Sequence, residues 1–396
     1  MNFVYISPNF PENHWHFCDR LRKNGVTVLG IGDCPYDDLK RELKESLNEY
    51  YKVSSLENYD EVYRAVAFFI HKHGRIDYLE SNNEYWLERD AALRQDFHIM
   101  SGFQPQDMPP VKCKSLMKDR YRLAGIPVAL YHMVDDRADC LAFIQQVGYP
   151  VVAKPDNGVG ANDTFRIGNE AELDLFFARR PNNVQYIMEE YIDGDVVSYD
   201  AIVNSQGEPI FETGNITLGS IMDIVNEAKS CPFMIRNPLP DTLRDMGRAA
   251  VKAFGVKKRF IHFEFFHLSR DQRIGKQGDF AALEVNMRPS GGVSPTMMNF
   301  ANSTDVYQIW ADMITADRRL LPPSGQDHWC VYASRKDSRT YKHTHEEILQ
   351  KYGDRITMCE RMPQIMWATM GCMMYMAHAY SEQEVQEFIR FVQEWA

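Results

Sequence analysis

Residues 2–97 alternate between apolar runs of strand character and amphipathic runs of helical character, which restricts the fold more than any other feature of the chain. The strand-like runs NFVYIS, VTVLGIG, YYKVSS and IDYLES are each followed by a helical pattern. Such alternation is typical of a parallel sheet covered by helices, and these sheets bind ligands beyond the carboxyl ends of their strands. No G-x-G-x-x-G follows the first strand, which disfavours a nicotinamide-dependent dehydrogenase.

A proline-containing stretch, GFQPQDMPPVK, ends this alternation and predicts a linker between domains. A short helical pattern follows, then a mixed region up to about residue 330, and finally the strand pattern WCVYASR with a terminal amphipathic helix. We therefore expect three parts: an N-terminal parallel α/β domain at 1–108, a mixed domain at 109–328 whose lid subdomain spans about 120–190, and a small C-terminal α/β part at 329–396.

The composition is that of an ordinary globular protein, with 44% hydrophobic and 25% charged residues. The net charge of −11 disfavours nucleic acid as the main partner. We expect a cytoplasmic protein without a membrane partner, because the chain has no long apolar run and its first residues lack the regions of a signal peptide. The eight cysteines form no C-x-x-C pair and are expected to be reduced thiols. The histidine pairs 14/16, 71/73 and 343/345 have an i, i+2 spacing that does not predict a metal site in a helix.

Two strand patterns, FIHFEFFHL and LEVNMRPSGG, predict a hairpin with one apolar and one polar face. The polar face of the second strand has Glu284, Asn286 and Arg288, and that of the first has Glu264. Adjacent strands lie about 4.8 Å apart, so the two glutamates are expected side by side, where they repel unless a cation lies between them. Oxygen ligands with a neighbouring amide suit Mg²⁺ or Mn²⁺ better than zinc. The alternative is a hairpin with two unrelated surface glutamates.

A second segment, YPVVAKPDNGVGANDTFRI, predicts a strand, a glycine-containing loop and another strand. Gly158 and Gly160 allow successive backbone N–H groups to surround an anion, and Lys154 adds a positive charge. No Gly-Lys-Ser/Thr follows, so this is not a Walker A loop, and by itself it is equally an ordinary flexible hairpin. Together with a Mg²⁺-type carboxylate pair it indicates a nucleoside triphosphate.

A third segment, VQYIMEEYIDGD, is an apolar strand interrupted at Glu189 and Glu190, which can offer backbone groups to the edge of a purine. Taken together and in this order, the segments resemble the ATP-grasp superfamily, closest to its carboxylate–amine ligase and biotin carboxylase-like branches. The resemblance covers nearly all of the chain and implies an N-terminal α/β domain followed by an ATP-grasp fold with a glycine-rich lid. It also implies ATP and Mg²⁺ (or Mn²⁺) as cofactors.

The resemblance assigns roles to individual residues. For the nucleotide it implies contacts from Lys114, Lys154, Gly158, Gly160, Glu189, Glu190, Tyr191, Ile192 and Asp195. Glu189 would bind the exocyclic amine of adenine, Glu264, Glu284 and Asn286 would bind the metal, and Arg288 with Lys154 would act on the transferred phosphate. The family commonly places a ribose-binding glutamate two residues past the glycine of YIDG. This chain has Val196 there, so Asp195 or Asp200 is expected to substitute.

The implied activity is an ATP-dependent, amide- or peptide-forming ligase that joins a small carboxylate to an amine through an acyl phosphate. A bicarbonate-activating carboxylase or carbamoyl-phosphate-type enzyme is the alternative reaction. A catalytically degenerate, regulatory ATP-binding module is the alternative outside enzymes. A homodimer is compatible with the resemblance. The substrate pocket is expected to include Asn83, Glu84, Arg236, Ser290, Gly291 and Gly292.

Overall fold

The computed structural model of the chain describes residues 1–158, 163–218, 232–236, 238–325 and 328–396, and it confirms the predicted α/β class. Gly160 lies outside these residues. The expected parallel sheet is present, with strand order β3-β2-β1-β4. Its strands are β1 (Asn2–Ile6), β2 (Thr27–Gly32), β3 (Glu49–Lys52) and β4 (Tyr78–Glu80). The helices between and after them are α1 (Trp15–Lys23), α2 (Arg41–Ser46), α3 (Tyr59–His73) and α4 (Leu87–Asp96).

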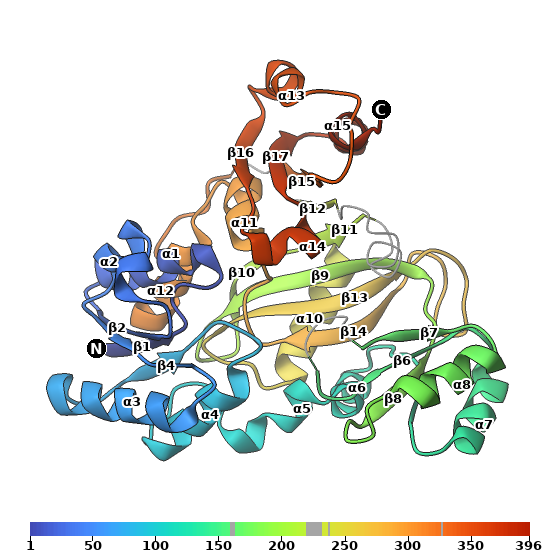
Figure 1. Cartoon of the computed structure of the whole chain (residues 1–396), viewed down its shortest axis with the longest axis horizontal. Coiled ribbons are helices and arrows are strands. Elements are labelled where there is room, and N and C mark those ends of the chain that lie inside the picture. Colours follow the sequence, from blue (N-terminus) through green and yellow to red (C-terminus); the bar gives the residue numbers. More distant parts are fainter. Residues whose placement is uncertain (159–162, 219–231, 237, 326–327) are drawn as a thin grey trace.

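The two faces of this sheet are buried by different helices, as alternating side chains on a parallel strand require. Phe3 and Tyr5 of β1 pack in one apolar cluster with α1, α2 and the later helix α12 (Val306–Ala316). Val4 and Ile6 pack in a second cluster with α3 and α4. Figure 1 shows this domain in blue, with α3 and α4 below the sheet and α1, α2 and α12 above it.

The predicted linker is more ordered than its prolines suggested. It forms the short helices η3 (Pro105–Asp107) and α5 (Pro109–Lys112), each with proline in its first turn, where no backbone N–H donor is needed. The helix α6 (Lys114–Leu123) follows directly. This segment connects the parallel sheet to the next domain without an extended loop.

The lid region contains a four-stranded antiparallel sheet with the order β5-β8-β6-β7. Its elements are β5 (Tyr131–Met133), α7 (Arg137–Val147), β6 (Val151–Pro155), β7 (Phe165–Ile167), α8 (Glu170–Arg179) and β8 (Tyr186–Glu190). The helices α7 and α8 bury one face of this sheet, which includes Ala153 and Met188. The alternate positions Lys154 and Glu189 therefore belong to the opposite face.

The largest sheet is antiparallel and has nine strands, with the order β14-β13-β9-β11-β12-β15-β17-β16 and with β10 beside β9 (Figure 1). Its strands are β9 (Gly194–Val203), β10 (Pro209–Thr213), β11 (Asn215–Thr217), β12 (Phe233–Ile235), β13 (Arg259–Leu268), β14 (Phe280–Asn286), β15 (Trp329–Arg335), β16 (Ile356–Arg361) and β17 (Met373–Ala379). The helices in this part are α10 (Asp241–Ala253), α11 (Ser294–Asn302), α13 (His345–Tyr352), η4 (Gln364–Met366), α14 (Trp367–Met370) and α15 (Glu382–Gln393).

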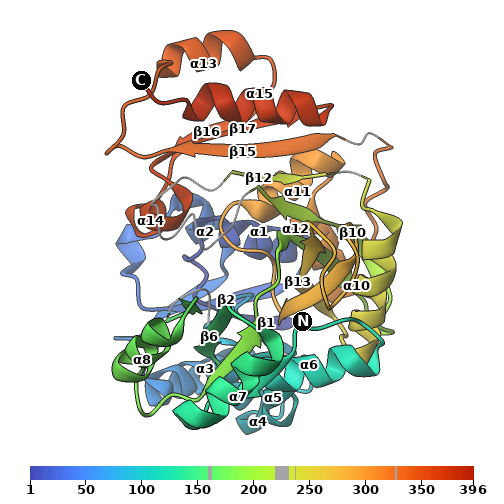
Figure 2. The same cartoon turned by 90° about the vertical axis from the view of Figure 1, so that its right-hand side faces the viewer.

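The C-terminal strands join this sheet through the pairing of β12 with β15. Figure 2 shows α13 and α15 stacked over β15, β16 and β17, at the top of the molecule. The division of the chain at 1–108, 109–328 and 329–396 stays a proposal, because one continuous sheet crosses the second boundary. Within the described ranges, none of the helices has the length and apolar character that crossing a bilayer requires.

The strands β9, β13 and β14 separate an apolar face from a polar one. On one side, Tyr199, Phe263 and Val285 pack in a core with α6 and α10. On the other side the strands present polar side chains from alternate positions, namely Ser198, Asp200, His262, Glu264, Glu284 and Asn286. This polar face is the centre of the candidate site.

Candidate active site

The two glutamates of the predicted hairpin lie side by side. Glu264 and Glu284 are direct partners in the register of β13 and β14, and the register shifts immediately after Glu264. Burial raises the pKa of Glu284, and the charge of Glu264 raises it further, although Lys114 opposes this with its Nζ 3.9 Å from Glu284 Oε2. Two carboxylates this close do not both ionise readily without a cation between them.

The donor set at this point fits a hard divalent cation. Asn286 lies two positions beyond Glu284 on the same face of β14, and its Oδ1 accepts a hydrogen bond from Arg288 at 3.2 Å. In the described part of the chain, no three His, Cys, Asp or Glu side chains are grouped for a metal, so the third protein ligand here would be the amide oxygen. Two carboxylates and an amide suit Mg²⁺ or Mn²⁺ rather than zinc.

His262, which the sequence reasoning did not assign to the site, fixes the orientation of Glu264. Its Nε2 lies 3.0 Å from Glu264 Oε1, and its Nδ1 lies 2.8 Å from Asp200 Oδ1. Burial opposes the charge on this ring, but Asp200 and Glu264 raise the pKa of His262 to about 9. The same contact lowers the pKa of Glu264 against the effect of burial. The signal was present in the sequence, since His262 and Glu264 share one strand face.

Asp200 was expected as a substitute ligand for the ribose, and its contacts in the structure give this expectation no support. Its side chain is fully buried and is committed to His262 and to the hydroxyl of Ser198. Asp195 is exposed, and alternation along β9 places it on the face of Val197, away from that of Glu264. The ribose contact therefore gains no support from either aspartate.

Lys114 connects the glycine loop to the carboxylate pair. It is buried at the first position of α6, and its Nζ donates to the carbonyl oxygen of Gly158 at 3.2 Å. The same Nζ is the one beside Glu284. The structure thus brings together three segments that the sequence analysis had linked only through their order in the chain.

Glu189 is held by two buried lysines from different elements. Its carboxylate lies 3.1 Å from Lys118 Nζ and 3.2 Å from Lys154 Nζ. Although burial opposes ionisation, these two charges lower the pKa of Glu189 to about 2. Lys118 was not assigned from the sequence, although it follows Lys114 by four positions and therefore lies on the same face of α6. The role of Glu189 toward adenine stays a prediction.

The other residues proposed to contact adenine are Glu190, Tyr191 and Ile192, and in this structure they contact mainly other parts of the protein. The Glu190 carboxylate accepts a hydrogen bond from Leu130 N at 2.6 Å and pairs with Arg273 of the β13–β14 connection. Its own N–H donates to Leu130 O at 3.0 Å. Ile192 is buried in a small apolar cluster, and Tyr191 is half-buried beside it in the chain. Any contact of Glu190 with a purine would therefore use its carbonyl oxygen.

A cavity of about 300 Å³ opens on the polar face of β13. Its lining includes Glu264, His262 and Arg288 together with the predicted substrate residues Ser290, Gly291 and Gly292. Val196, Phe233, Met366 and Met370 supply apolar wall. Arg236, also predicted there, does not line it and is exposed, with its guanidinium carbon 5.2 Å from the centre of the Trp329 ring.

The parallel domain contributes Glu84 near this cavity. Lys112 Nζ donates to Glu84 Oε1 at 2.9 Å, and Arg288 Nε lies 4.0 Å from Glu84 Oε2. That second oxygen is buried and has no hydrogen-bond partner among the described residues. Glu84 also contributes to the raised pKa of Glu284, after burial and the nearer charges. The predicted proximity of Glu84 to the site is therefore present in the structure.

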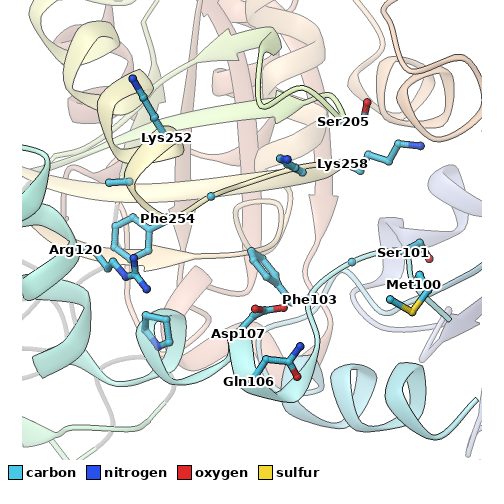
Figure 3. A pocket seen from close by; sticks show the side chains of 15 residues that line it. Met100, Ser101, Phe103, Gln106, Asp107, Arg120, Ser205, Lys252, Phe254 and Lys258 are labelled. Atoms are coloured by element: carbon cyan, nitrogen blue, oxygen red, sulfur yellow. The ribbon is translucent and has the colours of Figure 1, made fainter. Parts of the chain in front are cut away.

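A larger cavity, of about 670 Å³, lies on the other side of the sheet. It includes Phe254, whose ring packs against Phe263 on the apolar face of β13. Lys252 and Lys258 also line it, but Figure 3 shows their side chains pointing away from each other. Its cationic groups do not converge on one point, and none of the carboxylates described above lines it.

The chain is similar to known enzymes in sequence and in fold. No family model matches the sequence. The chain is 23% identical over 240 residues to an L-arginine-specific L-amino acid ligase of Bacillus subtilis, covering 58% of this chain and 56% of that protein. The chain therefore spans little more than half the length of this curated relative.

Solved structures match over almost the whole chain. An L-amino acid ligase from Bacillus licheniformis superposes with a TM-score of 0.71 and 16% identity, covering 99% of this chain and 96% of that one. The biotin carboxylase domain of the Hydrogenobacter thermophilus 2-oxoglutarate carboxylase, solved with MgADP, ADP and bicarbonate, has a TM-score of 0.71 and 14% identity, with 98% and 89% covered. At these identities the likeness shows the fold.

Proposed function

From the ATP-grasp fold that this chain has in common with amino-acid ligases and biotin carboxylases, we propose that it is an ATP- and Mg²⁺-dependent carboxylate–amine ligase. It forms an amide bond through an acyl phosphate and releases ADP and inorganic phosphate. The observation that supports this most directly is the convergence of Lys114, Glu264, Glu284 and Arg288 at one polar sheet face beside a cavity. Lys154 of the lid sheet is near enough for its charge to act on both glutamates.

The chemistry needs activation because a carboxylate oxygen is a poor leaving group. A carboxylate oxygen attacks the γ-phosphorus of ATP, an O–P bond forms, and the bond from the γ-phosphorus to the bridging oxygen of ADP breaks. The amine nitrogen then attacks the acyl carbon, the C–O bond to phosphate breaks, and the nitrogen loses one proton. ADP, phosphate and the amide are the products.

The residues of this chain support that sequence by position and charge. Glu264, Glu284 and Asn286 would hold Mg²⁺, which when bound offsets charge on the phosphate oxygens. Lys114 and Lys154, which lie near the glycine loop, would neutralise the nucleotide phosphates, and Arg288, which lines the cavity, would offset charge on the transferred phosphoryl group. His262 keeps Glu264 ionised and oriented.

A trapping experiment tests the proposal. The purified protein is incubated with ATP, Mg²⁺, hydroxylamine and single carboxylic acids, and both hydroxamate and nucleotide products are measured. Hydroxylamine is a small nucleophile that intercepts an acyl phosphate, so hydroxamate and ADP should form in equal amounts with an accepted acid. AMP and pyrophosphate as products would rule out the acyl phosphate.

Bicarbonate activation is the second candidate, because one matching structure is a biotin carboxylase domain solved with bicarbonate. The two reactions separate in the same assay. ADP release that depends on bicarbonate alone, with no hydroxamate from any organic acid, favours the carboxylase. ADP release that depends on an organic acid favours the ligase. A regulatory ATP-binding module would bind ATP without either dependence.

A further inference from the structure

A second cavity at the candidate site, of about 250 Å³, lies beside the one of about 300 Å³, between the parallel domain and the C-terminal strands β16 and β17. Its walls come from the segment after β1, from the start of α11, and from β16, β17 and η4. Most of its lining is apolar, and methionines dominate it. The apolar lining residues are Phe10, Pro11, Trp15, Val293, Met358, Met362, Pro363, Met366 and Met374.

The two cavities adjoin each other at Gly292 and Met366, which line both. Gly292 has a φ of +60°, and a Cβ atom there would lie 3.2 Å from Met370 Cε and 3.4 Å from Met366 Cε. A side chain at this position would therefore fill the boundary between the cavities. Glycine adds no atoms to the Met366 and Met370 methyl groups that already border this point, so a molecule that begins beside Arg288 can reach the second cavity when these flexible side chains shift.

The charged groups around the second cavity are paired or face solvent. Lys40 pairs with Glu12, and Arg361 pairs with Asp337 at 2.5 Å. Glu360 is exposed. Burial lowers the pKa of His16 to about 4, so this ring is neutral near pH 7. A charged ligand group in the apolar part of this cavity would have no free partner of opposite charge. Burying an unpaired charge costs free energy, so a neutral group is favoured there.

We propose that this methionine-rich cavity binds the side chain of the carboxylate substrate, and that the substrate is an amino acid with a neutral apolar side chain such as leucine, methionine or phenylalanine. The proposal rests on the proposed ligase function for the position of the carboxylate beside Arg288. Methionine side chains are flexible and polarisable, so the cavity accepts several apolar shapes rather than one. The two cavities together reach the size of small-molecule sites, which is roughly 300–1,000 Å³.

The test compares kcat/KM for different amino acids as the carboxylic acid substrate in the hydroxylamine assay. The wild-type protein should show a kcat/KM at least tenfold higher for leucine, methionine and phenylalanine than for glycine, lysine or glutamate. Met358→Trp fills the cavity from an edge strand, and the leucine-to-glycine ratio of kcat/KM should fall at least tenfold. Met358→Ala enlarges the cavity, and the phenylalanine-to-leucine ratio should rise.

Ile365→Trp is the matched control. Ile365 is 74% exposed on η4, directly before Met366, and does not line the cavity. The same added bulk at this position should leave the leucine-to-glycine ratio unchanged. Wild-type preference for charged or small acids would overturn the proposal. A Met358→Trp variant that lowers kcat/KM equally for every acid, while remaining folded by circular dichroism, would also overturn it.

A binding measurement separates this proposal from the proposed function. Calorimetric titration of leucine and glycine into the protein with ADP present does not require turnover. If no acid gives a hydroxamate, the ligase function fails, yet loss of leucine binding in Met358→Trp alone still supports the apolar site. If hydroxamate forms but leucine binding is the same in wild type, Met358→Trp and Ile365→Trp, the cavity is not the side-chain site.

Discussion

Glu264 and Glu284 are direct cross-strand partners on β13 and β14, and His262 holds the first of them while Lys114 approaches the second. As a result, the pKa values of the two glutamates shift in opposite directions. The contact with His262 lowers the pKa of Glu264, whereas burial and the charge of Glu264 raise that of Glu284. A cation between them would remove the repulsion, which is the physical reason to expect Mg²⁺ dependence here.

We expect Glu284→Gln to lower ATP turnover roughly 100-fold or more while the protein stays folded, because it removes one anionic metal ligand. It also removes a buried carboxylate beside another one, so thermal stability should not fall. Turnover across a Mg²⁺ titration and the melting temperature are the measurements. Glu42→Gln, which neutralises an exposed glutamate on α2, is the control. Normal turnover in folded Glu284→Gln would remove this residue from the site.

Lys154→Ala should raise the KM for ATP about tenfold or more, since a charge-assisted contact contributes about 1.5–3 kcal/mol. Lys154 is buried beside Glu189 at the start of the glycine loop. Steady-state kinetics with varied ATP provide the measurement. Lys252→Ala is the matched control, because Lys252 is an exposed lysine at the cavity on the other side of the sheet. Equal KM values for the two variants would contradict the role of Lys154.

The stability contributed by Glu189 should be lost in acid. Its pKa is about 2 in the folded protein and 4.5 ordinarily, so the contribution is complete above about pH 4.5 and declines as the pH falls toward 2. Glu189→Gln leaves Lys118 and Lys154 unpaired and should cost about 3 kcal/mol at pH 7. The difference in unfolding free energy between wild type and variant should shrink as the pH is lowered. Denaturant titrations between pH 7 and pH 3 measure it, and a constant difference would contradict the assignment.

Glu84 should affect activity separately from stability. Glu84→Gln weakens the buried pair with Lys112 and removes the negative charge 4.0 Å from Arg288. We expect this variant to have a lower free energy of unfolding. We also expect lower turnover of ATP in the presence of an accepted carboxylic acid. Adding Lys112→Met should restore part of the stability, because no unpaired charge then stays buried, but should not restore turnover. Recovery of both together would mean that Glu84 acts only through the fold.

Much of the fold was predictable because local pattern and tertiary structure agree. The alternation in residues 2–97 predicted the parallel sheet, and the period-2 polar face of the hairpin predicted that Glu264 and Glu284 meet. Lys114, Gly158 and Glu284 were expected in one site from their order in the chain, and they lie together. Side chains alternate between the two faces of a strand whatever the strand packs against. This alternation can therefore be predicted from neighbouring residues without information on distant contacts.

The sequence by itself determined which residues share a strand or helix face, and therefore the parallel domain and the carboxylate hairpin. Only the tertiary structure decided which faces meet. Lys118 reaches Glu189 because this side of α6 meets the lid sheet, and Asp200 is occupied because His262 lies on the neighbouring strand. The methionine-rich cavity forms from segments separated by hundreds of residues. Packing between distant segments depends on the side chains of the whole core. The spacing of residues within one segment therefore does not predict it.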